Sequence, residues 1–370
     1  LDSVPPSRDG SAAPTGVYNT WPGFHAEGLP PVAEAEVVDL VQSILDHLFM
    51  LLGTQEGFGY LLAWLAQMVQ DPSKPTNVAI LLQGQQGIGK DIIFEEFFCQ
   101  KVLGTGTAFT TAKPQSTIFG EFSAVLQNRV FLLLDEVSAD AMRPVMELFK
   151  DLITSSTTNI NPKNKTAYIV RNLSNTLCTT NTKNPFHIEP QDRRFVVFEC
   201  RRTKQGDTAY FQSLGDHLKR PEVARAFFQY LRDHVDVGPY TPFQVHRPQT
   251  SAYVAMQQRN IPLFYKFLSA QIEHATGVAN EEHAVLKGKE AFERFQAWGR
   301  QGNYNIQKTN ITNFGTDMTK LAEELTENDS SQDVFIKLAR TSAGQTYRVN
   351  WGKLRTFLQQ EARYDPNAVM

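Results

Sequence analysis

The chain has 370 residues, of which 41% are hydrophobic and 20% are charged, and its formal net charge is −3. These values are ordinary for a globular protein with room for two or three domains, and the small net charge excludes attraction to a polyanion by the field of the whole chain. With no C-x-x-C motif, no paired histidine spacing and no apolar run near the roughly 18 residues of a membrane span, the sequence supports no zinc site, no disulfide framework and no membrane contact.

The N-terminal part of the chain changes character near residue 34. Residues 1–33 are rich in Pro, Gly, Ser and Ala and show little apolar periodicity, so they predict a linker or a tethered arm. Over residues 34–72 apolar side chains recur at helical spacing, which predicts a helical N-terminal region of two or more helices. Because the chain begins at Leu1 without Met, we expect it to be a piece of a longer polypeptide.

The most informative segment runs from Val78 to Phe98, where an apolar strand, a glycine-rich loop and a helix follow one another. Gly84, Gly89 and Lys90 have the G-x-x-x-x-G-K spacing of a phosphate-binding loop in the context that this motif requires. Backbone N–H groups of such a loop bind phosphates, and its lysine reaches the β- and γ-phosphates. We therefore predict that a nucleoside triphosphate binds to a loop made of Gly84, Gln85, Gln86, Gly87, Ile88, Gly89, Lys90 and Asp91.

Carboxylates near this loop predict a magnesium site and a catalytic base. Asp91 departs from the motif, because Ser or Thr normally gives a hydroxyl to Mg²⁺ at this position. A carboxylate can still hold the metal directly or through water. A second apolar strand ends in Asp135 and Glu136, which can lie near Mg²⁺ and near the attacking water, respectively. Acids after a strand can also cap a following helix, so the catalytic interpretation depends on the phosphate-binding loop upstream.

Two further short strands carry polar neighbours. Asn181 follows the apolar segment Leu177–Thr180 and can orient a water and the γ-phosphate, although Asn is also a routine turn residue. Arg193 and Arg194 precede the apolar stretch Phe195–Phe198. This pair is a solvated face, a structural clamp, or the source of the guanidinium that a ring-forming ATPase receives from a neighbouring subunit.

Residues 157–170 contain two β-prone segments around a basic tip, which predicts a hairpin. The tip consists of Lys163, Asn164 and Lys165, and it suits a loop that follows a polyanion, because sequence-independent binding comes from lysine contacts to phosphates. The alternative is an exposed turn whose lysines serve solubility.

Strands are expected at Val78–Leu82, Val130–Leu134 and Leu177–Thr180, in alternation with helices, so the predicted fold class is α/β with a parallel sheet. A helix is expected over Glu222–His234. Residues 286–370 show another order, which is compatible with a winged-helix-like module. It consists of a helix over Leu286–Trp298, a hairpin formed by Val334–Arg340 and Gln345–Val349, and a helix over Trp351–Gln360.

Taken in order, these segments resemble the superfamily 3 helicases of viruses, phages and plasmids, especially the helicase half of phage-type primase-polymerases and poxvirus-type primase-helicases. The resemblance covers residues 60–200 well. It is carried by the phosphate-binding loop, the segment Ile118–Phe122, the strand that ends in Asp135 and Glu136, Lys150 with the basic hairpin, the strand end at Asn181, and Asp192–Phe195. It implies an AAA+ P-loop NTPase core, ATP and Mg²⁺ as cofactors, a homo-hexameric ring, and movement along single-stranded DNA.

The resemblance also implies roles and domains. Gly84–Asp91 would be motif A, Asp135 and Glu136 motif B, Lys163 and Lys165 the pore hairpin, Asn181 motif C, and Arg193 or Arg194 the arginine finger. The expected domains are an arm (1–33), a helical collar (34–72), an AAA+ core (73–240), a linker with a helix (241–285) and a winged-helix-like module (286–370). A primase or polymerase domain could precede Leu1, and the expected location is the cytoplasm or a host replication site of a virus, phage or plasmid.

The expected function is therefore that of an ATP-dependent replicative DNA helicase. Three alternatives remain open. An ATPase that melts origins or remodels DNA without translocation shares every motif. A P-loop kinase of small molecules would need neither the basic hairpin nor an arginine that acts on a neighbour, and an adaptor that binds ATP as a structural ligand would not require Glu136.

Overall fold

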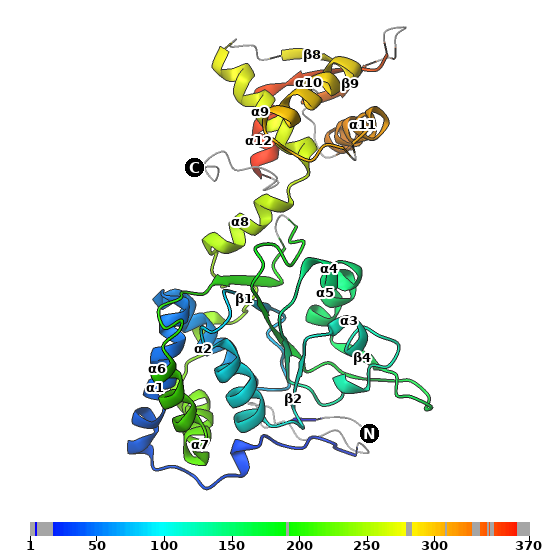
Figure 1. Ribbon diagram of the computed structural model, residues 1–370. Helices are drawn as coiled ribbons and strands as arrows, with labels where there is room; N and C mark the ends of the chain where they lie inside the picture. The colour runs from blue at the N-terminus through cyan, green and yellow to red at the C-terminus, as the bar shows by residue number, and fades with distance from the viewer. Residues whose placement is uncertain are drawn as a thin grey trace. The chain divides into compact units, whose positions relative to one another are not determined.

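The computed structural model describes residues 4–5, 18–189, 192–278, 283–307, 309–327, 334–338, 340 and 344–360. The chain divides into two compact units, residues 1–188 with 192–256 and residues 189–191 with 257–370. Figure 1 shows the helices and strands of each unit.

A five-stranded parallel sheet forms the centre of the first unit (Figure 1). Its strands are β1 (Ala79–Gln83), β2 (Ala108–Thr111), β3 (Phe131–Leu134), β6 (Asn175–Thr180) and β7 (Phe195–Glu199), in the order β2-β3-β6-β1-β7. The α/β class and the parallel sheet predicted from the sequence are confirmed, and the three predicted strands lie within two residues of their expected bounds. Strand β2 was not predicted, because it is a short edge strand with only its end residues buried.

The central strands are buried on both faces, which explains their continuous apolar runs. In β1, Ile80 and Leu82 belong to one hydrophobic core, whereas Ala79 and Leu81 belong to a second core on the other face. The first core also contains side chains from α1 (Glu34–Leu52), α2 (Gln55–Gln70), η2 (Ile92–Leu103) and α7 (Pro221–Gln229). The helical region predicted over 34–72 therefore shares a core with the sheet, and its separation as a collar stays a prediction.

The second core contains side chains from α5 (Met146–Thr154), from α8 (Ser251–Asn260) and from a hairpin. The hairpin consists of β4 (Thr157–Ile160) and β5 (Tyr168–Arg171), which pair in antiparallel orientation with Thr157 opposite Arg171. The hairpin predicted over residues 157–170 is thus confirmed.

Part of the predicted arm is fixed to the first unit. Residues 1–3 and 6–17 lie outside the described residues. Further along, Phe24 and Ala26 are buried, and Arg225 donates hydrogen bonds to the carbonyl oxygens of Ala26 (3.1 Å) and Glu27 (2.6 Å). These contacts attach the segment to α7, although its sequence shows no periodicity that predicts packing.

Several shorter elements complete the first unit. The helix predicted over Glu222–His234 divides at Gln229 into α7 and a π-type turn. The other elements are α3 (Pro114–Thr117), α4 (Ala139–Met142), α6 (Thr208–Leu218), η1 (Ala26–Gly28), η3 (Ala124–Leu126), η4 (Arg143–Val145), η5 (Tyr230–His234) and η6 (Gly238–Tyr240).

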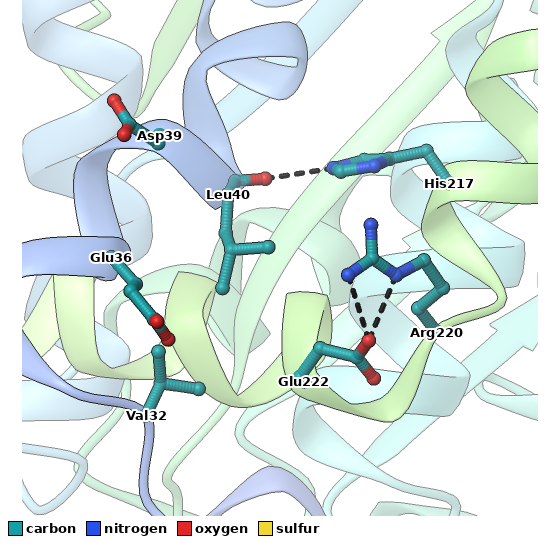
Figure 2. Close-up of a pocket in the computed structure, with 7 residues that line it drawn as sticks. All are labelled: Val32, Glu36, Asp39, Leu40, His217, Arg220 and Glu222. Atoms are coloured by element: carbon teal, nitrogen blue, oxygen red, sulfur yellow. Dashed lines mark hydrogen bonds and ion pairs between the residues drawn. The ribbon is translucent and has the colours of Figure 1, made fainter.

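Helix α1 and the junction of α6 with α7 line an open pocket of about 530 Å³ (Figure 2). Within it, Nε2 of His217 donates a hydrogen bond to the carbonyl oxygen of Leu40 (2.8 Å), and Arg220 forms an ion pair with Glu222 (2.8 Å). The first of these contacts ties α1 to α6.

The second unit combines helices with an antiparallel sheet of order β8-β10-β9. Its elements are α9 (Leu263–Val278), β8 (His283–Lys287), α10 (Gly288–Gln301), α11 (Ile311–Glu327), β9 (Phe335–Lys337), β10 (Thr346–Asn350) and α12 (Trp351–Gln360). The antiparallel pairing predicted for the hairpin is confirmed between β9 and β10, whereas residue 339 and the predicted turn residues 341–343 lie outside the described residues. The last helix is also confirmed. The helix predicted from Leu286 begins at Gly288 instead, because Leu286 pairs with Tyr347 across β8 and β10. A winged-helix-like arrangement stays a prediction.

Candidate nucleotide-binding site

The predicted phosphate-binding loop connects β1 to a helical segment that begins at Lys90 and continues as η2. Gly87 and Gly89 have φ angles of 76° and 92°, a left-handed conformation that favours glycine. At Gly89, a Cβ atom would also lie 2.4 Å from Nε2 of His47, a buried side chain of α1. Helix α1 therefore packs against the loop, and the closeness of His47 leaves no room for a side chain at position 89.

Lys90 is buried within this loop, with only 7% of the residue exposed. Its Nζ donates hydrogen bonds to the carbonyl oxygens of Gly84 (3.2 Å) and Gln85 (2.9 Å). An ammonium is a point charge on a flexible stem, so it can exchange these carbonyls for phosphate oxygens, with which its hydrogen bonds are stronger.

A buried hydroxyl joins the two predicted acids at the end of β3. Thr179, on the neighbouring strand β6, donates a hydrogen bond from Oγ1 to Oδ1 of Asp135 (2.5 Å). Oγ1 of Thr179 also accepts a hydrogen bond from the backbone N–H of Glu136 (3.0 Å). Only 2% of Thr179 is exposed. One hydroxyl therefore fixes the side chain of Asp135 and the backbone of Glu136.

Glu136 lies against the phosphate-binding loop. Its carboxylate accepts a hydrogen bond from Nε2 of Gln86. Its φ angle is 50°, which is uncommon for a residue with a side chain, and such conformations gather at functional sites. Gln205, from the segment between β7 and α6, donates hydrogen bonds to Oε1 of Gln85 (3.2 Å) and to the carbonyl oxygen of Gln86 (3.0 Å).

Three carboxyl groups near the loop influence one another. Burial raises the pKa of Asp91, and the negative charge of Asp135 raises it further. The pKa of Glu95 is raised by burial first and then by the charges of Asp135 and Asp91. A cation relieves such repulsion, so the chemistry of Asp91 and Asp135 fits a bound Mg²⁺. Within the described part of the chain, no three His, Cys, Asp or Glu side chains are grouped to hold a metal, so water and phosphate oxygens would complete its coordination.

Asn181 lies at the same edge of the sheet as the two acids. It directly follows β6, which is placed between β3 and β1. The backbone N–H of Gly84 donates a hydrogen bond to the carbonyl oxygen of Thr180 (2.9 Å), so the end of β6 adjoins the start of the loop. Asn181 is exposed there, and its positioning role stays a prediction.

Arg193 and Arg194 lie at the opposite edge of the sheet, because they precede the start of β7. The carbonyl oxygen of Arg194 accepts a hydrogen bond from the N–H of Ala79, the first residue of β1 (2.8 Å). The Arg194 guanidinium pairs with the buried Asp192 (3.3 Å), whereas Arg193 is exposed. The structure therefore does not bring this pair to the phosphate-binding loop of its own chain.

The basic hairpin tip also lies outside the nucleotide site. Lys163, Asn164 and Lys165 are exposed, and Asn164 has a φ angle of 61° within the turn. Asn tolerates this conformation better than most residues. The predicted contact of the tip with DNA stays a prediction.

The catalytic role predicted from the sequence for Glu136 gives an expectation for Thr179. If Glu136 positions the water that attacks ATP, replacement of Thr179 by valine lowers kcat for ATP hydrolysis about a hundredfold with little change in KM, because the water loses its alignment when Glu136 shifts. Sequence reasoning did not single out Thr179, since its role depends on the register between β3 and β6. Steady-state ATPase assays check this expectation.

Two further variants serve as controls. Thr179→Ser should retain the rate. Thr180→Val removes a neighbouring hydroxyl that donates to the carbonyl oxygen of Val137 (2.7 Å), and it should leave kcat near wild type. Equal losses in both valine variants would indicate a structural role alone.

Comparisons with known proteins find a matching family model and a similar phage protein. The model of a family of unknown function, DUF5906, matches residues 82–194, which include the predicted phosphate-binding loop, β3 with the following Asp135, and β6 with the following Asn181. The DNA primase-polymerase of Nitratiruptor phage NrS-1 is 30% identical over 175 residues, which correspond to 45% of this chain and 22% of that protein. The chain therefore aligns with about a fifth of the length of this relative.

Solved structures of the NrS-1 C-terminal region share the fold. One apo structure matches with a TM-score of 0.60 and 20% sequence identity, and the match covers 90% of this chain and 79% of that chain. A second apo structure matches with a TM-score of 0.53 and 21% identity over 75% of this chain and 73% of the other. At this identity the likeness shows the fold alone. No helix in the described ranges is both long and apolar enough to span a membrane.

Proposed function

We propose that this chain is the ATP-hydrolysing motor of a replicative DNA helicase, with an AAA+ core of the superfamily 3 type. The observation that carries the proposal is the convergence of a phosphate-binding loop and two acids at one edge of a parallel sheet. Lys90 lies inside the loop, and the Glu136 carboxylate contacts Gln86 of the same loop. The similarity to a phage DNA primase-polymerase supports a role in DNA replication.

In the proposed mechanism, Lys90 neutralises charge on the β- and γ-phosphates of ATP. Asp135, with Asp91 near it, would hold Mg²⁺, which would compensate phosphate charge when bound. Glu136 accepts a hydrogen bond from the attacking water, and Asn181 at the end of β6 orients the water relative to the γ-phosphate. The Gln86 side chain must release the Glu136 carboxylate before the water can bind there.

The proposal includes a ring of identical subunits, for which a hexamer is expected. The support is the position of Arg193 and Arg194 at the sheet edge away from their own loop. From that edge a guanidinium can stabilise a transferring phosphoryl group only in a neighbouring subunit. In such a ring, Lys163 and Lys165 from several subunits would together face single-stranded DNA. A primase or polymerase domain elsewhere in the full-length protein is part of the same proposal, as is a phage, virus or plasmid origin.

Replacement of both Lys163 and Lys165 by alanine tests this function. For each subunit that contacts the strand, we expect loss of the two lysines to weaken oligo(dT) binding about 60-fold at 0.05 M salt and about tenfold at 0.2 M, because each phosphate contact contributes about −0.7 to the slope of log K against log salt and contributes nothing near 1 M. Fluorescence anisotropy measures binding, and an ATPase assay measures stimulation by the oligonucleotide, which should fall in parallel.

Lys101→Ala is the matched control, because it removes an exposed lysine of η2 and should change neither value. If the double variant equals wild type, the hairpin is an ordinary turn and the proposed movement on DNA loses its support. A strand-displacement assay separates a helicase from an ATPase that remodels DNA without unwinding it.

A further inference from the structure

The base of the β4–β5 hairpin borders a groove of about 680 Å³. The groove lies between this hairpin and residues 73–77, which precede β1. Among its twelve lining residues none is acidic, two are basic, and seven carry a hydroxyl or amide side chain. The basic residues are Lys74 and Arg171. A groove of this composition favours an anionic ligand with many hydrogen-bond acceptors.

The hairpin has a buried face and a free face, and the free face borders this groove. Ile160 and Val170 point into the second hydrophobic core. On the alternate positions, Arg171 lies opposite Thr157 and Ile169 lies opposite Asn159, and all four side chains are exposed. Ile169 is 73% exposed, which is unusual for a large aliphatic residue on a strand. This face therefore combines a cation, two polar side chains and an apolar side chain.

The two cations of the groove differ in their partners. Lys74 forms an ion pair with the buried Asp71 (3.0 Å), so part of its charge is compensated within the chain. The Arg171 guanidinium has no hydrogen-bond or ion-pair partner among the residues described in the structure. A guanidinium presents a planar set of donors that matches a phosphate group. Arg171 is therefore the residue of the groove best suited to an external phosphate.

The groove and the proposed DNA-binding tip lie at the two ends of the same hairpin. Residues 157–171 contain Lys163, Lys165 and Arg171 and no acid, in a chain whose net charge is −3. Arg171 follows Lys165 by six residues, a separation of at most about 20 Å along the strand. A single strand that crosses the tip can therefore reach the base of the same hairpin with a few further nucleotides.

We propose that this groove is a second contact surface for single-stranded DNA, in which Arg171 binds a backbone phosphate and Ile169 packs against a sugar or base. The inference rests on the proposed function, because single-stranded DNA is chosen as the ligand of the groove on the ground that the basic hairpin binds DNA. It adds a site at the base of the hairpin to the tip residues, and it predicts a longer footprint on DNA than the tip alone requires.

The test compares Arg171→Ala, Ile169→Glu and the control Lys101→Ala in the full chain, with fluorescein-labelled oligo(dT) at several salt concentrations. For each subunit that contacts the strand, Arg171→Ala should weaken binding about eightfold at 0.05 M salt and about threefold at 0.2 M, since it removes one phosphate contact and makes the salt slope shallower by about 0.7. Ile169→Glu should also weaken binding, because it places a negative charge on the same face. Both positions are exposed, so melting temperatures should stay near wild type.

The outcomes separate this inference from the function on which it rests. If Lys163→Ala with Lys165→Ala weakens binding but Arg171→Ala matches Lys101→Ala, the groove is not a DNA site and the proposed function stands. If none of the hairpin variants weakens binding, both proposals fail. If Arg171→Ala and Ile169→Glu change the oligomeric state measured by light scattering and leave DNA affinity per assembled ring unchanged, the face is a subunit contact and the DNA occupant is excluded.

Discussion

Replacement of Lys90 by alanine should reduce ATP hydrolysis to less than about a thousandth of the wild-type rate and should also weaken nucleotide binding. The first effect is expected because the ammonium compensates charge that grows on the phosphates in the transition state, and loss of one such preorganised donor costs about 10²–10³ in rate even for an uncharged group. The second is expected because the same charge interacts with the phosphates in the ground state. An ATPase assay measures the rate, and titration with a fluorescent ATP analogue measures binding.

The structure adds a reason to monitor the fold of this variant. Lys90 donates to two backbone carbonyls of the loop, at Gly84 and Gln85, and both lose a donor in the alanine variant. The loop conformation can therefore change together with the charge. Lys101→Ala is again the control, and circular dichroism and melting temperature establish that both variants are folded. Wild-type hydrolysis in a folded Lys90→Ala variant would contradict the assignment of the phosphate-binding loop.

The parts of this fold that the sequence predicted are those with local signals. Strand β1 and its loop combine a short apolar run with glycines at fixed spacing, and the φ angles of Gly87 and Gly89 explain why glycine is required there. The β4–β5 hairpin was recognisable because β-prone segments flank a turn-forming tip. In both cases a few consecutive residues contain the whole signal.

The contacts that organise the candidate site could not be predicted in the same way. The bridge from Thr179 to Asp135 depends on which strands are neighbours and on their register. The contact of Gln86 with Glu136 depends on the conformation of a loop. The hydrogen bond from Gln205 to the carbonyl oxygen of Gln86 joins residues that are 119 positions apart in the sequence. At Leu286 two patterns compete. The apolar spacing of α10 extends back to Leu286 and predicts a helix there, but Leu286 belongs to β8 and pairs with Tyr347 of β10. Sequence periodicity does not encode such long-range partners.

The position of the two arginines follows from a simple rule of parallel sheets. In a parallel sheet, residues that precede a strand lie at the amino ends of the strands, and residues that follow a strand lie at the carboxyl ends. Arg193 and Arg194 precede β7, whereas Asp135 and Asn181 follow β3 and β6, so the length of the strands separates the two pairs. Arg194 is further held by the buried Asp192, which leaves Arg193 as the more exposed of the two. An arginine finger from this pair is therefore compatible only with a neighbouring subunit.

Replacement of Glu136 by glutamine should lower ATP hydrolysis about 10²–10⁴-fold and leave ATP bound, since it removes the general base and preserves the charge of Lys90 and the shape of the side chain. The amide keeps an oxygen that can accept from Gln86, and the backbone bond to Thr179 is unaffected, so the loop should keep its conformation. Single-turnover hydrolysis and retention of a labelled ATP on the protein measure the two effects. Glu121→Gln, a change at an exposed acid before β3, is the matched control and should hydrolyse ATP at the wild-type rate.

The comparison of Glu136→Gln with Lys90→Ala makes the assignment specific. If both carboxylate and ammonium act as proposed, the glutamine variant traps ATP and the alanine variant releases it, although neither hydrolyses it. Trapped ATP should also hold the assembled ring on single-stranded DNA, because the proposed subunit contact through Arg193 or Arg194 requires a γ-phosphate. A Glu136→Gln variant that hydrolyses ATP at the wild-type rate would show that another residue activates the water, and the strained backbone of Glu136 would then serve only to fix the contact between β3 and the loop.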